Sequence, residues 1–324
     1  MSVEMFLEVS LNTSEFEVLW GKLVRESGVS IPMKALAVYL ITSFGAAYAL
    51  DIPLVTGAVS LKYFRVEASV RMWVPFLGAV IALLACGVPL REGLKRLGVR
   101  LGRLAYLPLG LITPYIIYLV GAGVCYLMGY APVNPVEALL SNPQVPQQVK
   151  ELILRSGPEV FLVLQLVNAA VAGLTINAAL ALGEEVGWRG LMYEVLYPRY
   201  GLLASTAVIG VAWGLWHAPL ILFLGYSMPH HRNVVGLAMY CAVTTSWTLI
   251  LLLLRRGSGS VLPAAIMHGT INALGGLMAL TFPGMDGLYG LPVGAGSLIA
   301  SLMVGGVMAA VLGRPKARVK PGQP

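Results

Sequence analysis

Charge is scarce in this chain of 324 residues: 11% are Asp, Glu, Lys or Arg, whereas 57% are hydrophobic. A soluble globular protein carries about 25% charged residues. The deficit excludes an ordinary water-soluble domain and predicts a membrane protein with several spans. The net charge of +7 does not indicate a nucleic-acid partner, because few of the basic residues cluster with aromatic residues.

Cysteine is also scarce, and the motifs of two common hydrolase classes are absent. Cys86, Cys125 and Cys241 all lie in apolar segments, without a CxxC pair or Cys/His spacing, so we expect neither a disulfide framework nor a thiolate metal site. Neither the HExxH motif of zinc proteases nor the GxSxG motif of serine hydrolases occurs.

Long apolar runs are abundant, and eight of them could cross about 30 Å of hydrocarbon. They lie near 34–50, 72–90, 104–128, 159–183, 202–224, 234–254, 260–282 and 291–312. The predicted fold is therefore an all-α polytopic membrane protein, a bundle of about eight transmembrane helices. We expect the fourth run to continue as a helix to Tyr197, before Pro198 and Gly201 break it.

The basic residues predict an orientation for this bundle. Sixteen of the 22 Lys and Arg residues fall on one side of an eight-span arrangement. Because basic residues concentrate in cytoplasmic loops, we expect both termini in the cytoplasm and the loop 129–158 outside. The densest basic segment, residues 91–103, is then a cytoplasmic loop near anionic membrane lipid.

The expected organisation has three parts, all in an integral multi-pass membrane protein that would sit in the cell membrane of a prokaryote. A cytoplasmic segment, 1–33, precedes a transmembrane domain, 34–312, and a basic cytoplasmic tail, 313–324, follows it. The first segment is polar and acidic, so we expect no cleavable signal peptide.

Two adjacent glutamates inside an apolar stretch, Glu184 and Glu185, are the first functional candidates. Ionisable residues at membrane depth are costly and are commonly paired or functional. Glu185 and Arg189 are four residues apart on a helix, so they form an acid–base pair and Glu185 becomes structural. Glu184 lacks a local cation and is the candidate general base. The alternative is that both glutamates belong to a buried structural ion network.

Two further apolar runs carry polar pairs with the same helical spacing. Trp213 and His217 share one helix face, and so do His268 and Asn272. Each pair taken alone could be an interhelical hydrogen-bonding group. His268 and Asn272 could instead hold a developing oxyanion. Together with the glutamates, the two pairs predict a hydrolytic site.

These three motifs resemble, in order and spacing, those of the CAAX prenyl protease and bacteriocin-processing (CPBP, abortive-infection) family of intramembrane proteases, which includes the Ras-converting CAAX endopeptidases. EEVGWR, from Glu184 to Arg189, is similar to the family's EExxxR. Trp213 to His217 resembles an aromatic residue followed by x-x-x-His, with Trp where the family often has Phe. His268 to Asn272 resembles HxxxN. The resemblance covers about residues 155–285, the expected protease-like core.

The resemblance implies a role for each matching residue. Glu184 would be the general base, His217 would help to activate a water, and His268 and Asn272 would form the oxyanion hole. Bracing roles would fall to Glu185, Arg189 and Trp213. A geometric difficulty arises, because Glu184 would lie toward the cytoplasmic side while His217 is some 16 residues into the fifth span. A late helix start or a strong tilt would be needed to bring the two level.

The predicted function is that of an intramembrane endopeptidase that cleaves near the C-terminus of a peptide or protein substrate, at the cytoplasmic leaflet. Whether the substrate is prenylated stays open. No cofactor is required, but zinc remains an alternative, held by Glu184, His217 and His268 with an open position. The rival functions are a non-catalytic scaffold or bacteriocin-immunity-type protein of the same fold, or a transporter. The chain lacks the repeated halves typical of transporters.

Overall fold

The computed structural model describes residues 31–143 and 145–312, and the regular elements in these ranges are all helical. The predicted all-α class is therefore confirmed for the described part of the chain. The predictions made for residues 1–30 and 313–324 fall outside it. The helices are α3 (Lys34–Val55), η1 (Leu61–Tyr63), α4 (Phe64–Arg71), α5 (Val74–Ala85), α6 (Leu90–Arg96), α7 (Tyr106–Leu127), α8 (Pro135–Ser141), α9 (Gln147–Ser156), α10 (Pro158–Leu174), α11 (Ile176–Glu185), η2 (Val186–Met192), α12 (Tyr193–Trp216), η3 (Leu220–Leu224), α13 (Val234–Ser258), α14 (Leu262–Leu280) and α15 (Ala295–Leu312).

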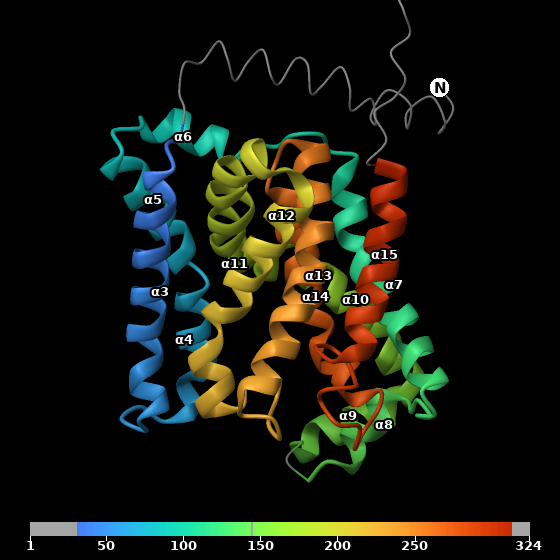
Figure 1. The fold of residues 1–324 in the computed structure, drawn as a ribbon. Helices are drawn as coiled ribbons and strands as arrows, with labels where there is room; N and C mark the ends of the chain where they lie inside the picture. The colour runs from blue at the N-terminus through green and yellow to red at the C-terminus, as the bar shows by residue number, and fades with distance from the viewer. Residues whose placement is uncertain (1–30, 144, 313–324) are drawn as a thin grey trace, which may run out of the picture.

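The long helices form one bundle between two ends, with α6 at the upper end in Figure 1 and α8 and α9 at the lower end. At the upper end Arg100 Nε donates to the carbonyl of Gly259 over 2.8 Å. At the lower end the backbone N–H of Val133 donates to the carbonyl of Thr281 over 2.9 Å. Segments that the basic pattern assigned to the same side thus meet at the same end. Which end faces the cytoplasm stays a prediction.

Fewer segments than the expected eight pass a test of length and hydropathy, and one of those that pass, Ile176–Trp216, contains the kink at Gly201 and so two helical segments. Among the described residues six helical segments are long and apolar enough to cross a membrane, or seven if α9 and α10, bent by 107°, count as one span. The six are Lys34–Val55, Leu61–Ala85, Tyr106–Leu127, Ile176–Trp216, Val234–Ser258 and Ala295–Leu312. The expected seventh run is a helix, α14, but polar side chains such as His268 and Asn272 lower its hydropathy, and it is not among them.

The fourth run is not the continuous helix that the sequence predicted. The backbone breaks at Thr175 (φ −121°, ψ −102°), which separates α10 from α11. Directly after the glutamates, α11 passes into the π-helical segment η2. Such segments inside helical runs are frequent at functional sites. The helix then continues through Pro198, and the expected break comes at Gly201.

The kink at Gly201 removes the difficulty of aligning Glu184 with His217. Gly201 has φ 72° and ψ −173°, a conformation that glycine adopts without steric cost. Glu184 lies seventeen residues before this kink and His217 sixteen residues after it. At a rise of about 1.5 Å per residue, each lies about 25 Å from Gly201 along the helical segment on its own side of the kink. The two residues are therefore level without a late helix start or a strong tilt.

A close approach between α11 and α14 sets the third motif beside the first. Asn177 Nδ2 donates to the backbone carbonyl of Gly269 over 3.2 Å. Small residues at helix interfaces in membranes allow backbones to approach closely. This contact places His268, the neighbour of Gly269, next to Glu185.

Candidate active site

Glu185 is the centre of a buried polar network. Arg189 NH1 donates to Glu185 Oε1 over 3.0 Å, and both side chains are completely buried. The ion pair predicted from their spacing is thus present. His268 Nδ1 lies 2.9 Å from the same Oε1, and Arg189 NH2 donates to the hydroxyl of Thr248 over 2.8 Å. Glu185 therefore holds both a cation and the candidate oxyanion-binding histidine.

Glu184 has different surroundings, although it is also buried. Trp213 Nε1 donates to Glu184 Oε2 over 2.7 Å, which leaves Oε1 as an acceptor for a water. The guanidinium of Arg189 lies 4.3 Å from the centroid of the Trp213 ring, within the range of a cation–π contact. Among the ion pairs of the described residues none includes Glu184.

Both histidines are oriented through Nδ1. His217 follows the last residue of α12, and its Nδ1 lies 2.9 Å from the carbonyl of Trp213. A carbonyl only accepts, so this Nδ1 carries the proton, and in a neutral ring Nε2 is the free acceptor. The bond from His268 Nδ1 to the Glu185 carboxylate fixes the same tautomer. His268 can donate to an oxyanion only when Nε2 is also protonated.

The residues that the sequence selected as catalytic meet in one small cavity of about 90 Å³. Its lining includes Glu184, Trp213, His217, His268 and Asn272. A second cavity of about 670 Å³ lies next to it. The two cavities have four lining residues in common: Tyr226, Tyr240, Trp247 and Asn272.

The larger cavity is bordered by the loops that follow η3 and α14, at the lower end of the bundle. His231 Nε2 lies 2.7 Å from the Asp286 carboxylate and joins these loops. The sequence analysis did not predict this pair, since the residues are 55 positions apart.

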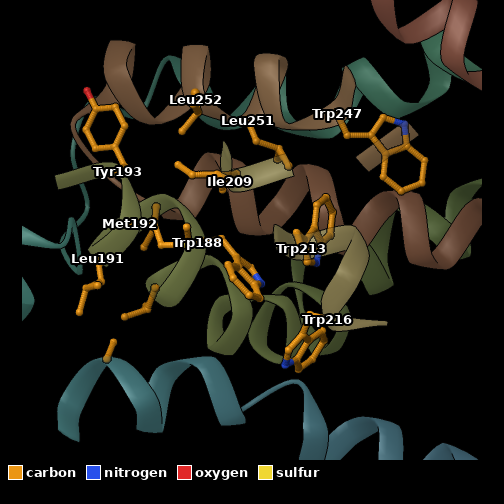
Figure 2. Close-up of a cluster of buried hydrophobic side chains, with 14 of the residues drawn as sticks. Trp188, Leu191, Met192, Tyr193, Ile209, Trp213, Trp216, Trp247, Leu251 and Leu252 are labelled. Carbon is orange, nitrogen blue, oxygen red and sulfur yellow. The ribbon is translucent and has the colours of Figure 1, made fainter. Parts of the chain in front are cut away.

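Aromatic side chains line the small cavity and pack beside it. Figure 2 shows Trp188 from η2 together with Trp213 and Trp216 from α12 and Trp247 from α13. The ring centroids of Trp188 and Trp216 lie 5.9 Å apart in an edge-to-face arrangement. Close packing of large rings leaves few alternative rotamers, so the polar groups of the site are held in fixed positions.

Among the residues of the small cavity that sequence reasoning did not select, one is charged: Arg71, at the end of α4. Its side chain is 2% exposed, and Nε donates to Asp51 Oδ1 over 2.7 Å. The Asp51–Arg71 pair could have been found by the feature that selected Glu184, which is a charged residue beside an apolar run. No motif spacing includes these residues.

The donors present do not form a zinc site. Among the described residues no three His, Cys, Asp or Glu side chains are grouped as metal ligands. The alternative set of Glu184, His217 and His268 therefore gains no support from the geometry, and no step of the mechanism below uses a metal.

Comparisons with known proteins agree with the three motifs. Residues 161–274 match the family model described as type II CAAX prenyl endopeptidase Rce1-like. A stretch of 101 residues is 31% identical to CAAX prenyl protease 2 of Methanococcus maripaludis, covering 30% of this chain and 37% of that protein. The resemblance to the CAAX-processing family is thereby confirmed. All four catalytic candidates lie inside the matched segment, whereas Asp51 and Arg71 lie outside it.

Proposed function

We propose that this chain, residues 161–274 of which belong to the CAAX prenyl protease and bacteriocin-processing family, is an intramembrane endopeptidase. The observation that carries the proposal is the meeting of Glu184, His217, His268 and Asn272, from three helical segments, around one small cavity. A cavity with few, converging polar groups is the usual form of an enzyme site.

The proposed reaction is hydrolysis by one activated water. The water lies between Glu184 Oε1 and His217 Nε2, and Glu184 accepts its proton as the hydroxide attacks the peptide carbonyl carbon. Asn272 and protonated His268 donate to the carbonyl oxygen as it becomes negative. The intermediate then collapses, the C–N bond breaks, and the proton held by Glu184 passes to the leaving amine.

The larger cavity supplies the proposed route for the substrate peptide. It adjoins the small cavity through Asn272, the residue assigned to the oxyanion, so a chain lying in it presents its carbonyl to the catalytic groups. A volume of about 670 Å³ is in the usual range for a ligand site. The proposed substrate is the C-terminal part of a peptide or protein, with or without a prenyl group.

The position of this cavity conflicts with part of the sequence prediction. The cavity lies at the end of the bundle opposite to the basic segment 91–103. If the basic residues face the cytoplasm, the cavity does not open to the cytoplasmic leaflet, where cleavage was predicted. Single cysteines introduced into the loop 129–158, at the cavity end, decide the orientation by labelling of intact cells. Labelling from outside would reject cytoplasmic cleavage, and labelling only from the cytoplasm would reject the predicted topology.

The test of the proposed function is cleavage of fluorogenic peptides, with and without a prenylated cysteine, by the purified protein. We expect hydrolysis by the parent and none by Glu184→Gln. The matched control is Glu137→Gln, on the exposed face of α8, which should retain activity. A scaffold or immunity protein would cleave neither peptide. A transporter would show ion or solute flux that does not depend on peptide.

A further inference from the structure

The C-terminal end of α12 carries His217 and needs partners for its backbone carbonyls. The last carbonyls of a helix have no partner within the helix. His217 itself satisfies two of them: its Nδ1 binds the carbonyl of Trp213 over 2.9 Å, and its backbone N–H donates to Gly214 over 3.0 Å. The orientation of the ring therefore depends on the conformation of this helix end.

Further hydrogen bonds to this helix end come from the N-terminal helices. Tyr48 Oη in α3 donates to the carbonyl of Leu215 over 2.7 Å. Arg71 NH2 in α4 donates to the carbonyl of Trp216. The indole N–H of Trp216 donates in turn to the carbonyl of Ser43 over 3.2 Å. Helices outside the family-matched segment thus hold the two residues directly before His217.

The Arg71 side chain is held by contacts to Asp51 and to Trp216. Nε and NH2 donate to the two Asp51 oxygens over 2.7 and 3.2 Å. The guanidinium carbon lies 3.6 Å from the centroid of the Trp216 ring. A cation is also favourable at the C-terminal end of a helix, where the helix dipole is negative.

The end of α4 contacts the glutamate side of the site as well. A Cβ atom on Gly183, the residue before Glu184, would lie 2.5 Å from the carbonyl oxygen of Met72. The backbone at Arg71 and Met72 therefore packs directly against α11. It lies between the segments that carry the candidate base and His217.

Two other roles for the Asp51–Arg71 pair, binding an anionic substrate group and stabilising the fold, are less well supported. The carboxylate of Asp51 compensates the charge of Arg71, so the pair offers little net charge to an anionic substrate group. Stability is also a poor reason, because replacing a buried ion pair by apolar residues is often neutral or stabilising. From the contacts to Trp216 we infer that Arg71 is a positioning residue: it holds the end of α12 so that His217 faces the catalytic water. The inference rests on the proposed function for its role in catalysis.

The test uses a double variant, Asp51→Leu with Arg71→Met, which removes both charges of the pair. The protein has four histidines, so their ring ¹⁵N signals can be assigned by NMR. We expect the His217 signals to shift and those of His230 and His231, in the loops, to stay. The matched control removes a second buried pair, Glu194→Leu with Arg255→Met, and should leave His217 unchanged. Unchanged His217 signals in the folded Asp51/Arg71 variant would overturn the inference.

Kinetics gives the second readout. Misplacing a catalytic group by about 1 Å can cost about 100-fold in rate, so we expect kcat of the double variant to fall by about that factor, with KM unchanged. Combined with His217→Ala, the double variant should be no slower than His217→Ala alone. If the two losses multiplied instead, Arg71 would act independently of His217 and the inference would be wrong. If the double variant shifts the His217 signals but the parent protein shows no peptidase activity, positioning is supported and the proposed function is rejected.

Discussion

Replacing Glu185 by Gln removes one charge from the most buried ion pair of the site. Glutamine keeps the shape and an acceptor for Arg189, which lies 3.0 Å from Glu185 Oε1. Arg189 would then retain only the Thr248 hydroxyl and the Trp213 ring as further partners. Removing one partner of a buried pair typically costs about 3–5 kcal/mol, because the other charge stays buried without compensation. We expect a clear fall in the thermal unfolding midpoint, measured in detergent by tryptophan fluorescence.

Glu184→Gln is the matched control, one position away and equally buried. Glu184 has no ion-pair partner among the described residues, and a glutamine oxygen can still accept from Trp213. Its unfolding midpoint should stay at the parent value while turnover is abolished. Adding Arg189→Leu to Glu185→Gln should recover part of the lost stability, because the uncompensated cation is removed. Equal midpoints for the two glutamine variants would refute the division between a bracing and a reacting glutamate.

Three further perturbations probe the metal question, the larger cavity and the loops around it. Chelation should leave activity intact, and Asn272→Ala should lower turnover by about 10²–10³-fold, as for loss of one oxyanion donor; activity lost on chelation and restored by zinc alone would contradict this. Gly276→Leu should lower kcat/KM, because Gly276 lines the larger cavity and no atom lies within 4 Å of an added Cβ. Gly306 on α15 has equally open space but lines neither cavity, so Gly306→Leu should leave kcat/KM unchanged. Equal effects of the two substitutions would reject the peptide route. The backbone N–H of Leu288, and then an imidazole, hold the pKa of Asp286 below its ordinary value of 3.8. Its contribution to loop stability is therefore present above that value and lost as the pH falls through the lowered pKa. Proteolysis of the loop should rise only in strong acid, and Asp286→Asn should remove this dependence; a rise near neutral pH would contradict the assignment.

The sequence alone determined the class of protein and the local pairs of the site. Scarce charge and long apolar runs predicted the helical membrane bundle, and the helical period predicted that Glu185 faces Arg189. That pair is formed as expected. The same period placed His217 one turn after Trp213, where its ring binds the Trp213 carbonyl. Such contacts span about one helical turn, so their geometry follows from the spacing of the residues.

The number of spans was less predictable. Hydropathy identified α14 as a helix, but its polar site residues reduce the hydropathy on which such counts depend. The break at Thr175 has no proline beside it, and the nearest glycine, Gly173, is still part of α10. The π-helical segment after Glu185 is likewise a response to packing, which a helical period does not encode.

Only the tertiary structure decided which helix faces meet. The bonds from Trp213 to Glu184 and from His268 to Glu185 join residues 29 and 83 positions apart. Arg71 reaches the site from still further away, 145 positions before the Trp216 carbonyl that it binds. Residues this distant come together through the packing of whole helices, where small side chains permit close approach. Local spacing therefore selected the chemical groups and predicted the Glu185–Arg189 pair, and long-range packing decided which distant side chains contact the two glutamates.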